Sequence, residues 1–408
     1  MTRDNDDETT VSILPLEPLR YHTELVLHLQ AQEAELWNWF STDRLRAQNN
    51  EAVKLDLLKA TYRIERDANP TLYAAFDEVA SALNLSCPVT FYQSSGGGAL
   101  NASLAYMPGE AHIVFVGPLL TTLTPVELKC VLGHELMHFA LLDRWHEYLV
   151  ATQMLSAMCN DAQAQPAHQA SARLLGLYTE VLCDRAAYQA TKDLASTITA
   201  LVRIETGTTD VAAESYLRQT DEIFAKGHPR TEGVTHPETF IRARALQLWV
   251  GNPQSAGDEI AQVIEGALSL EDLDLLGQQR VAAMTRRLVG RFLRPSWLHT
   301  EAQLAHARLF FDDFAPASAI DEELAEDLAG VTDKLRDYYC YVLLDFATAD
   351  RDLEDAPLAA ALLLSDELGL GDRFRQLATK ELNLRKKQLE ALDAEASAIV
   401  AKAQEAAT

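Results

Sequence analysis

Residues 131–140 read VLGHELMHFA, and this stretch decides how the rest of the chain is interpreted. Just ahead of it, Thr124–Glu127 (TPVE) offers an N-cap threonine, a proline at the first helical position and a glutamate at the third. A helix is therefore predicted to begin at this proline. His134 and His138 are four residues apart, so both imidazoles lie on one face of the helix. Glu135 is offset from that face by about 100°.

The pattern H-E-x-x-H predicts a zinc site. In such sites the two histidines bind the metal, and the glutamate acts as general base on the zinc-activated water. A third protein ligand leaves the fourth position of the metal open. The alternative is a pair of partly buried histidines whose hydrogen bonds are satisfied within the fold. The sequence thus predicts one Zn²⁺ per chain, held by His134 and His138, with Glu135 as the catalytic base.

A carboxylate pair further along the chain is the candidate for the third ligand. Glu180 and Asp184 are four residues apart on a helix predicted to begin near Ser171, and apolar residues flank them. Two carboxylates on an apolar helix face are costly unless a cation compensates them. Glu180 is therefore predicted to coordinate the metal, and Asp184 to accept the free N–H of a metal-bound histidine. The alternative is a surface-facing acidic pair bridged to Arg185 or another base.

The acidic composition argues against several partners. The 408 residues carry 60 acidic and 35 basic side chains, and the net charge of -25 repels phosphate backbones, so no nucleic acid is expected.

No run is long and apolar enough for a membrane span, and the N-terminus lacks the apolar core of a signal peptide. Five scattered cysteines without a C-x-x-C pair suit reduced thiols. A cytoplasmic protein is expected, with Cys130 and Cys183 as small buried side chains.

The chain is long enough for two domains. The predicted parts are a flexible acidic N-terminus, a motif-bearing domain and a helical C-terminal domain, at residues 1–20, 21–250 and 258–408. Residues 21–66 have a helical pattern, and helices are again predicted after residue 121. Strands are predicted only at Val89–Gln93 and His112–Val116. The predicted fold class is α+β and mostly α-helical, with a small β-sheet followed by an all-α domain.

The surroundings of the motif resemble a known family. H-E-x-x-H followed by E-x-x-x-D on a later helix is the gluzincin pattern, and the chain resembles the heat-shock protease HtpX and the CaaX prenyl proteases. The matching pieces follow in order: Asn101-Ala102, the strand His112–Val116, Leu119–Leu128 and Thr235–Arg242. The resemblance covers about residues 50–250 and implies a zincin-like metalloprotease domain. Well-known members are integral membrane proteins, whereas no span is predicted here, so a soluble member is expected.

By this resemblance the chain is a zinc metalloendopeptidase that hydrolyses peptide bonds. The implied substrate is an extended or unfolded polypeptide, which would add a strand along His112–Val116. His236 resembles the family histidine near the site and would stabilise the oxyanion or position the substrate. The alternative for His236 is a cap on the helix that begins at Pro237. Arg242 resembles the arginine that follows, and would anchor a site carboxylate or form a structural salt bridge.

The C-terminal part carries no comparable motif. Asp345–Leu370 resembles a helical repeat of TerB-like tellurite-resistance domains, and the alternative is an acidic helix start. This domain is expected to regulate the protease, to bind a protein partner or to mediate self-association. A second hypothesis for the whole chain is a non-catalytic, zinc-containing scaffold that acts through these helices. Glu135 argues against the scaffold, since a residue that binds no metal has little purpose there without a water to activate.

Overall fold

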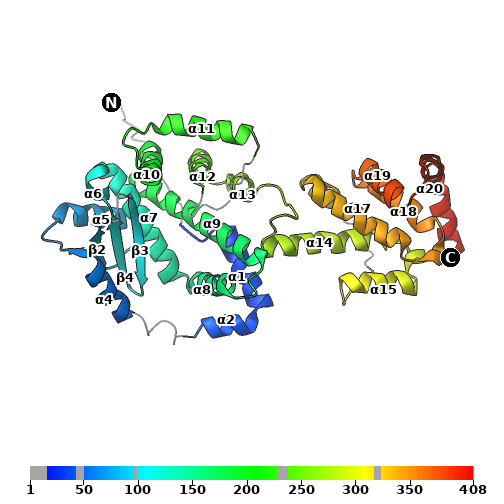
Figure 1. Cartoon of the computed structure of the whole chain (residues 1–408), viewed down its shortest axis with the longest axis horizontal. Coiled ribbons are helices and arrows are strands. Elements are labelled where there is room, and N and C mark those ends of the chain that lie inside the picture. Colours follow the sequence, from blue (N-terminus) through cyan, green and yellow to red (C-terminus); the bar gives the residue numbers. More distant parts are fainter. Residues whose placement is uncertain (1–15, 43–49, 96–98, 228–237, 317–322, 408) are drawn as a thin grey trace, which may run out of the picture. The chain divides into compact units, whose positions relative to one another are not determined.

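The computed structural model describes residues 16–42, 50–95, 99–227, 238–316 and 323–407 (Figure 1). The chain divides into two compact units, Met1–Gly266 and Ala267–Thr408. Helices dominate both units, and the predicted α+β, mainly α-helical class is confirmed. Among the helices that are described, none combines the length and the apolar character that crossing a bilayer requires.

In the first unit, helices surround a small sheet. Its helices are α1 (Arg20–Gln32), α2 (Ala34–Phe40), α4 (Asn50–Ala60), α5 (Pro70–Ala82), α6 (Leu119–Thr122), α7 (Pro125–Arg144), α8 (His146–Asn160), α9 (Pro166–Thr191), α10 (Leu194–Thr206), α11 (Ala213–Ala225), α12 (Thr239–Gly251) and α13 (Gly257–Glu265). Its strands are β1 (Tyr62–Ile64), β2 (Val89–Ser94), β3 (Asn101–Met107) and β4 (Glu110–Val116). The longest helices, α7 and α9, pack along each other, and α7 also contacts β3.

The four strands lie in the order β1-β2-β4-β3. β2 pairs with β4 in parallel, with Phe91 opposite Ile113, whereas β1 and β3 run antiparallel to their neighbours. Phe91 and Phe115 are fully buried and stack with their ring centroids 5.5 Å apart. Phe76 of α5 meets Phe91 edge-on at 5.7 Å. This aromatic cluster packs α5 onto the sheet and forms part of the core of the unit.

The sheet corrects three predictions. β1 lies inside the stretch that was expected to be helical, and β3 is a strand where only the approach to β4 was expected. The prediction that a substrate adds a strand along His112–Val116 is wrong, because β4 already pairs with β2 on one side and β3 on the other. β3 is the edge strand of the described sheet on that side, so its backbone is the one placed to pair with an added strand.

The second unit is helical throughout its described residues. Its elements are α14 (Leu275–Phe292), the 3₁₀ turn η2 (Ser296–Leu298), α15 (Glu301–Phe310), α16 (Leu324–Ala329), α17 (Asp333–Thr348), the 3₁₀ turn η3 (Arg351–Leu353), α18 (Ala356–Glu367), α19 (Gly371–Glu381) and α20 (Lys386–Ala406). Tyr339, Phe346 and Phe374 are fully buried in its own hydrophobic core. The unit therefore has the core that an independent domain needs.

Candidate metal centre

α7 begins with a reciprocal cap. The Thr124 hydroxyl accepts a hydrogen bond from the Glu127 N–H at 3.3 Å, and the Glu127 carboxylate accepts one from the Thr124 N–H at 2.8 Å. Arg203 of α10 pairs with the buried Glu127 at 2.9 Å. The predicted helix start is thus confirmed. The cap sets where the helical turns fall, and His134 and His138 project from one face with their Nε2 atoms 3.1 Å apart.

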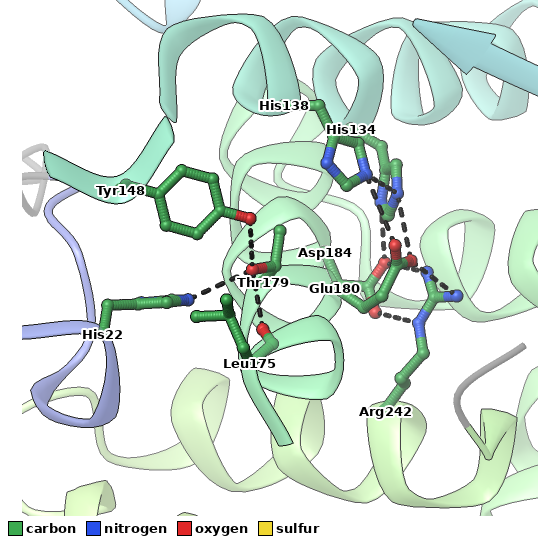
Figure 2. Close-up of polar contacts among 9 residues, drawn as sticks. All are labelled: His22, His134, His138, Tyr148, Leu175, Thr179, Glu180, Asp184 and Arg242. Atoms are coloured by element: carbon green, nitrogen blue, oxygen red, sulfur yellow. Dashed lines mark hydrogen bonds and ion pairs between the residues drawn. The ribbon is translucent and has the colours of Figure 1, made fainter. Parts of the chain in front are cut away.

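α9 brings the carboxylate pair to the two histidines, as Figure 2 shows. Glu180 Oε2 lies 3.3 Å from His134 Nε2, and Glu180 Oε1 lies 3.4 Å from His138 Nε2. His134 Nδ1–H donates to Asp184 Oδ1 at 3.0 Å. Asp184 is only 3% exposed, so this carboxylate does not face the solvent as the alternative would require. α9 begins at Pro166, earlier than the predicted start near Ser171, with its proline in the first turn.

Gly133 lets α7 and α9 approach closely, directly ahead of the first histidine. A Cβ at this position would lie 3.1 Å from Ala190 Cβ and 3.2 Å from both Ala186 O and Ala187 Cα. Such distances are shorter than a side chain ordinarily tolerates, so any larger residue would push the helices apart. The close crossing allows side chains from both helices to converge on one point.

Arg242 of α12 contacts both carboxylates. Its Nε and Nη2 donate to Asp184 at 2.8 and 2.7 Å, and its Nη1 lies 3.0 Å from Glu180 Oε2. Burial alone would raise the pKa of both carboxyls, but the guanidinium holds the pKa of Asp184 below its usual range and that of Glu180 well below. Both side chains are therefore ionised. Arg242 thus forms ion pairs with both carboxylates of the pair.

His134 carries a positive charge in the metal-free chain. Burial alone would lower its pKa, but the hydrogen bonds to Asp184 and Glu180 outweigh burial and raise the pKa to about 10. The carboxylates thus hold a proton on the ring at neutral pH. A divalent cation bound at the same point would supply the positive charge that this proton supplies.

The donor atoms fit a tetrahedral metal ion. Ligands that each lie about 2.0–2.1 Å from one such ion are about 3.3 Å from one another. The separations among His134 Nε2, His138 Nε2 and the Glu180 oxygens are 3.1, 3.3 and 3.4 Å. Two imidazoles and a carboxylate are also a donor set that zinc accepts in catalytic sites. The residues present therefore fit zinc.

Cys183 is a competing donor that sequence reasoning did not place here. Its Sγ forms a cluster with the ligand atoms of His134 and His138, all within 4.8 Å of one another. Burial and the nearby charges of Glu180, Asp184 and Glu135 raise the pKa of its thiol well above the usual value. The Glu180 oxygens lie 3.3 and 3.4 Å from the two imidazole nitrogens, close to the separation that a tetrahedral ion requires, so Glu180 is the better third donor. The prediction that Cys130 and Cys183 are buried is confirmed.

Glu135 faces a cavity of about 590 Å³ beside the histidines. The residue is 5% exposed, yet neither of its carboxylate oxygens has a hydrogen-bond or ion-pair partner within the described parts of the chain. β3 forms one wall of the cavity with Asn101–Leu104. Another wall is apolar and comes from α7, α9 and α10, through Cys130, Val131, Ala187, Ala200, Leu201 and Ile204. A buried carboxylate on such a cavity is placed to meet a water or a substrate.

The structure thus brings together five predicted site residues, His134, His138, Glu180, Asp184 and Arg242, with Glu135 lining the same cavity. His236 lies outside the described residues. The α10 wall and the β3 edge were missed. The sequence of α10 is strongly amphipathic, and this pattern predicts that one face of the helix is buried. It does not predict that the buried face lines a cavity.

Comparison with known proteins gives one finding. No curated protein and no solved structure matches the chain significantly. Residues 67–250, which include α7, α9 and all but the last residue of α12, match the model of peptidase family M48. Since M48 peptidases are zinc-dependent metallopeptidases, the segment that carries the converging histidines and carboxylates is similar to a metallopeptidase, and the match supports that function.

Proposed function

We propose that the first unit is a zinc-dependent endopeptidase. His134, His138 and Glu180 would hold the metal, and Glu135 would act as general base. The single observation that carries the proposal is the position of Glu135, buried and without a partner among the described residues, on the cavity that the converging donors share. A structural zinc site has no use for such a carboxylate, because its metal has no open position.

The chain's own residues would divide the chemistry. When bound, zinc supplies Lewis-acid chemistry that makes water a nucleophile near neutral pH. Glu135 would take the proton of the attacking water and return it to the leaving amine. Asp184 holds the Nδ1 proton of His134, so that Nε2, once it has lost its own proton, would present its lone pair to the metal. Arg242 offsets the charges of Asp184 and Glu180, so that both carboxylates stay ionised in a buried site.

An extended or unfolded polypeptide is the substrate that the cavity suits. Its backbone would pair with the edge strand β3, which lines the cavity at Asn101–Leu104. A substrate side chain next to the cleaved bond would pack against the apolar wall of the cavity, which includes Ala200 and Leu201. Backbone pairing tolerates many sequences, so the choice of bond would depend on that one side chain.

The test is the variant Glu135→Gln. Because the amide cannot take a proton, we expect hydrolysis of an unfolded protein to fall about 1,000-fold, in the middle of the range for loss of a general base. Zinc content should stay at the wild-type level. Peptide release is measured by mass spectrometry, and metal by elemental analysis. Equal hydrolysis by the variant would refute the role of Glu135, and no hydrolysis by either protein would favour the scaffold hypothesis.

Several finer statements stay predictions. They are the role of His236, the likeness to HtpX and the CaaX proteases, the TerB-like repeat, the cytoplasmic location, the domain limits at 1–20, 21–250 and 258–408, and a regulatory or partner-binding role for the C-terminal domain. Removing the second unit and comparing hydrolysis with the full chain would test the last of these.

A further inference from the structure

The N-terminal helix α1 contacts α9 at the two residues that directly precede Glu180. Tyr21 stacks on Tyr178, with ring centroids 4.7 Å apart and an interplanar angle of 4°. The next residue, His22, contacts Thr179 with its Nε2 3.2 Å from the hydroxyl oxygen. All four side chains are buried. α1 lies outside the segment that matches family M48, so the match does not account for this contact.

The donor and the acceptor of each hydrogen bond around Thr179 can be assigned from the neighbouring bonds. The Leu19 N–H donates to His22 Nδ1 at 2.9 Å, so the proton of this neutral ring is on Nε2, which donates to Thr179 Oγ1. Burial, assisted by the charge of Arg185, lowers the pKa of His22 to about 3 and keeps the ring neutral. Tyr148 O–H donates to the same oxygen at 2.8 Å, and Thr179 donates to Leu175 O at 2.8 Å.

The Thr179 hydroxyl therefore makes its one donated and both accepted hydrogen bonds inside the protein. Bonds from α1 and α8 meet at this atom, and its own bond returns to the α9 backbone. Such a network resists rotation and sliding of α9, since either motion would break buried hydrogen bonds. Figure 2 shows the network on one side of α9 and the Glu180 site on the other.

None of His22, Tyr148 and Thr179 lines the cavity, so any effect on the site must act through the helix. The side chains of Thr179 and Glu180 are about 100° apart around the helix axis, and a turn of α9 moves both together. Resting on the proposed function, we propose that His22 and Tyr148 are positioning residues: through Thr179 they hold α9 in the orientation in which Glu180 completes the metal site. α1 is then a working part of the peptidase unit.

The experiment uses the full chain and Co²⁺ as the probe, because Co²⁺ replaces zinc and has a visible spectrum that depends on its ligand geometry. Thr179→Val keeps the shape of the side chain and removes the hydroxyl. We expect Co²⁺ to bind about ten-fold more weakly or worse, as for other residues that orient a ligand, with a changed absorption spectrum. Thr179→Ser keeps the hydroxyl and should restore both.

Tyr148→Phe removes a single oxygen and serves if Thr179→Val does not fold. Tyr73→Phe is the matched control, because the Tyr73 hydroxyl also makes a buried hydrogen bond of 2.8 Å, to Ile64 O, far from α9 in sequence. The control should lower the melting temperature and leave Co²⁺ binding unchanged. If Tyr148→Phe and Thr179→Val also lower only the melting temperature, the network is structural and the proposal is overturned. Glu180→Ala separates the two proposals: unchanged Co²⁺ binding in that variant would instead refute the metal site itself.

Discussion

Zinc binding to this chain should release about one proton per metal ion at neutral pH. In the metal-free chain the pKa of His134 is about 10, because Asp184 and Glu180 outweigh the effect of burial. The ring therefore carries protons on both nitrogens at pH 7. The Nδ1 proton stays with Asp184, but the Nε2 proton must leave before that nitrogen can bind a metal.

The size of the effect follows from the pKa. Each pH unit below it makes the metal-competent form of His134 ten-fold rarer, so at pH 7 the apparent affinity for zinc should be about 1,000-fold below its limit at high pH. Between pH 6.5 and 8.5, the logarithm of the affinity should rise by about one per pH unit. A site with ordinary histidines would show most of its change below the usual histidine pKa of about 6.5.

Two measurements check this. Competition against a fluorescent zinc chelator gives the affinity across the pH range, and calorimetry in buffers of different protonation enthalpy gives the number of protons released. Asp184→Asn is the informative variant, because loss of the carboxylate should lower the pKa of His134 and reduce proton release at pH 7. Zinc binding that releases no proton, with an affinity that is constant from pH 7 to 8.5, would refute the charge assignment.

Three further outcomes are expected. The free energy of unfolding of the metal-free chain should fall as pH rises from about 6.5 to about 10, because the folded chain keeps a proton on His134 that the unfolded chain releases; urea titrations at several pH values measure it. Arg242→Ala should destabilise the metal-free chain by about 3–5 kcal/mol, since it leaves buried carboxylates unpaired. The same change at Arg244, whose partner is exposed, should cost less than about 1 kcal/mol by the same titration. Ala200→Phe should fill the apolar wall of the cavity and lower kcat/KM about 10-fold or more for peptides with a leucine or phenylalanine beside the cleaved bond.

Each has a contradicting result. A stability that does not depend on pH would mean that His134 is neutral in the metal-free fold. Similar costs at Arg242 and Arg244 would show that the site carboxylates do not need their guanidinium. If Ala200→Phe slowed the cleavage of peptides with glycine or alanine beside the bond equally, the apolar wall would not select the side chain, and zinc content would show whether the metal site had been damaged.

The predictable part of the site rests on local signals. The cap at Thr124 acts over three residues, and the spacing of His134 and His138 determines their common face, so both could be inferred from a short window. The pair of Glu180 and Asp184 was visible for a similar reason, because two carboxylates one helical turn apart in an apolar stretch call for a cation.

The remainder depends on contacts between distant segments. β3 is a strand because it pairs with β4. It lies at the edge of the sheet because β2 pairs with the opposite side of β4. No window of sequence contains that order. Likewise, nothing in the sequence around Tyr21 and His22 indicates that they contact α9. His22 and its partner Thr179 are 157 residues apart in the chain.

The absent side chain at Gly133 has a consequence for the choice of metal. The metal donors come from two helices, so the size of the space between them depends on how closely the helix axes approach. At Gly133 only a hydrogen atom separates the α7 backbone from Ala186 and Ala187 of α9. Gly133 therefore helps to determine the radius of the ion that fits, although it would not contact the ion itself. In this chain, a bulkier residue in place of Gly133 would move the histidines away from Glu180 and favour a larger cation, such as cadmium, over zinc.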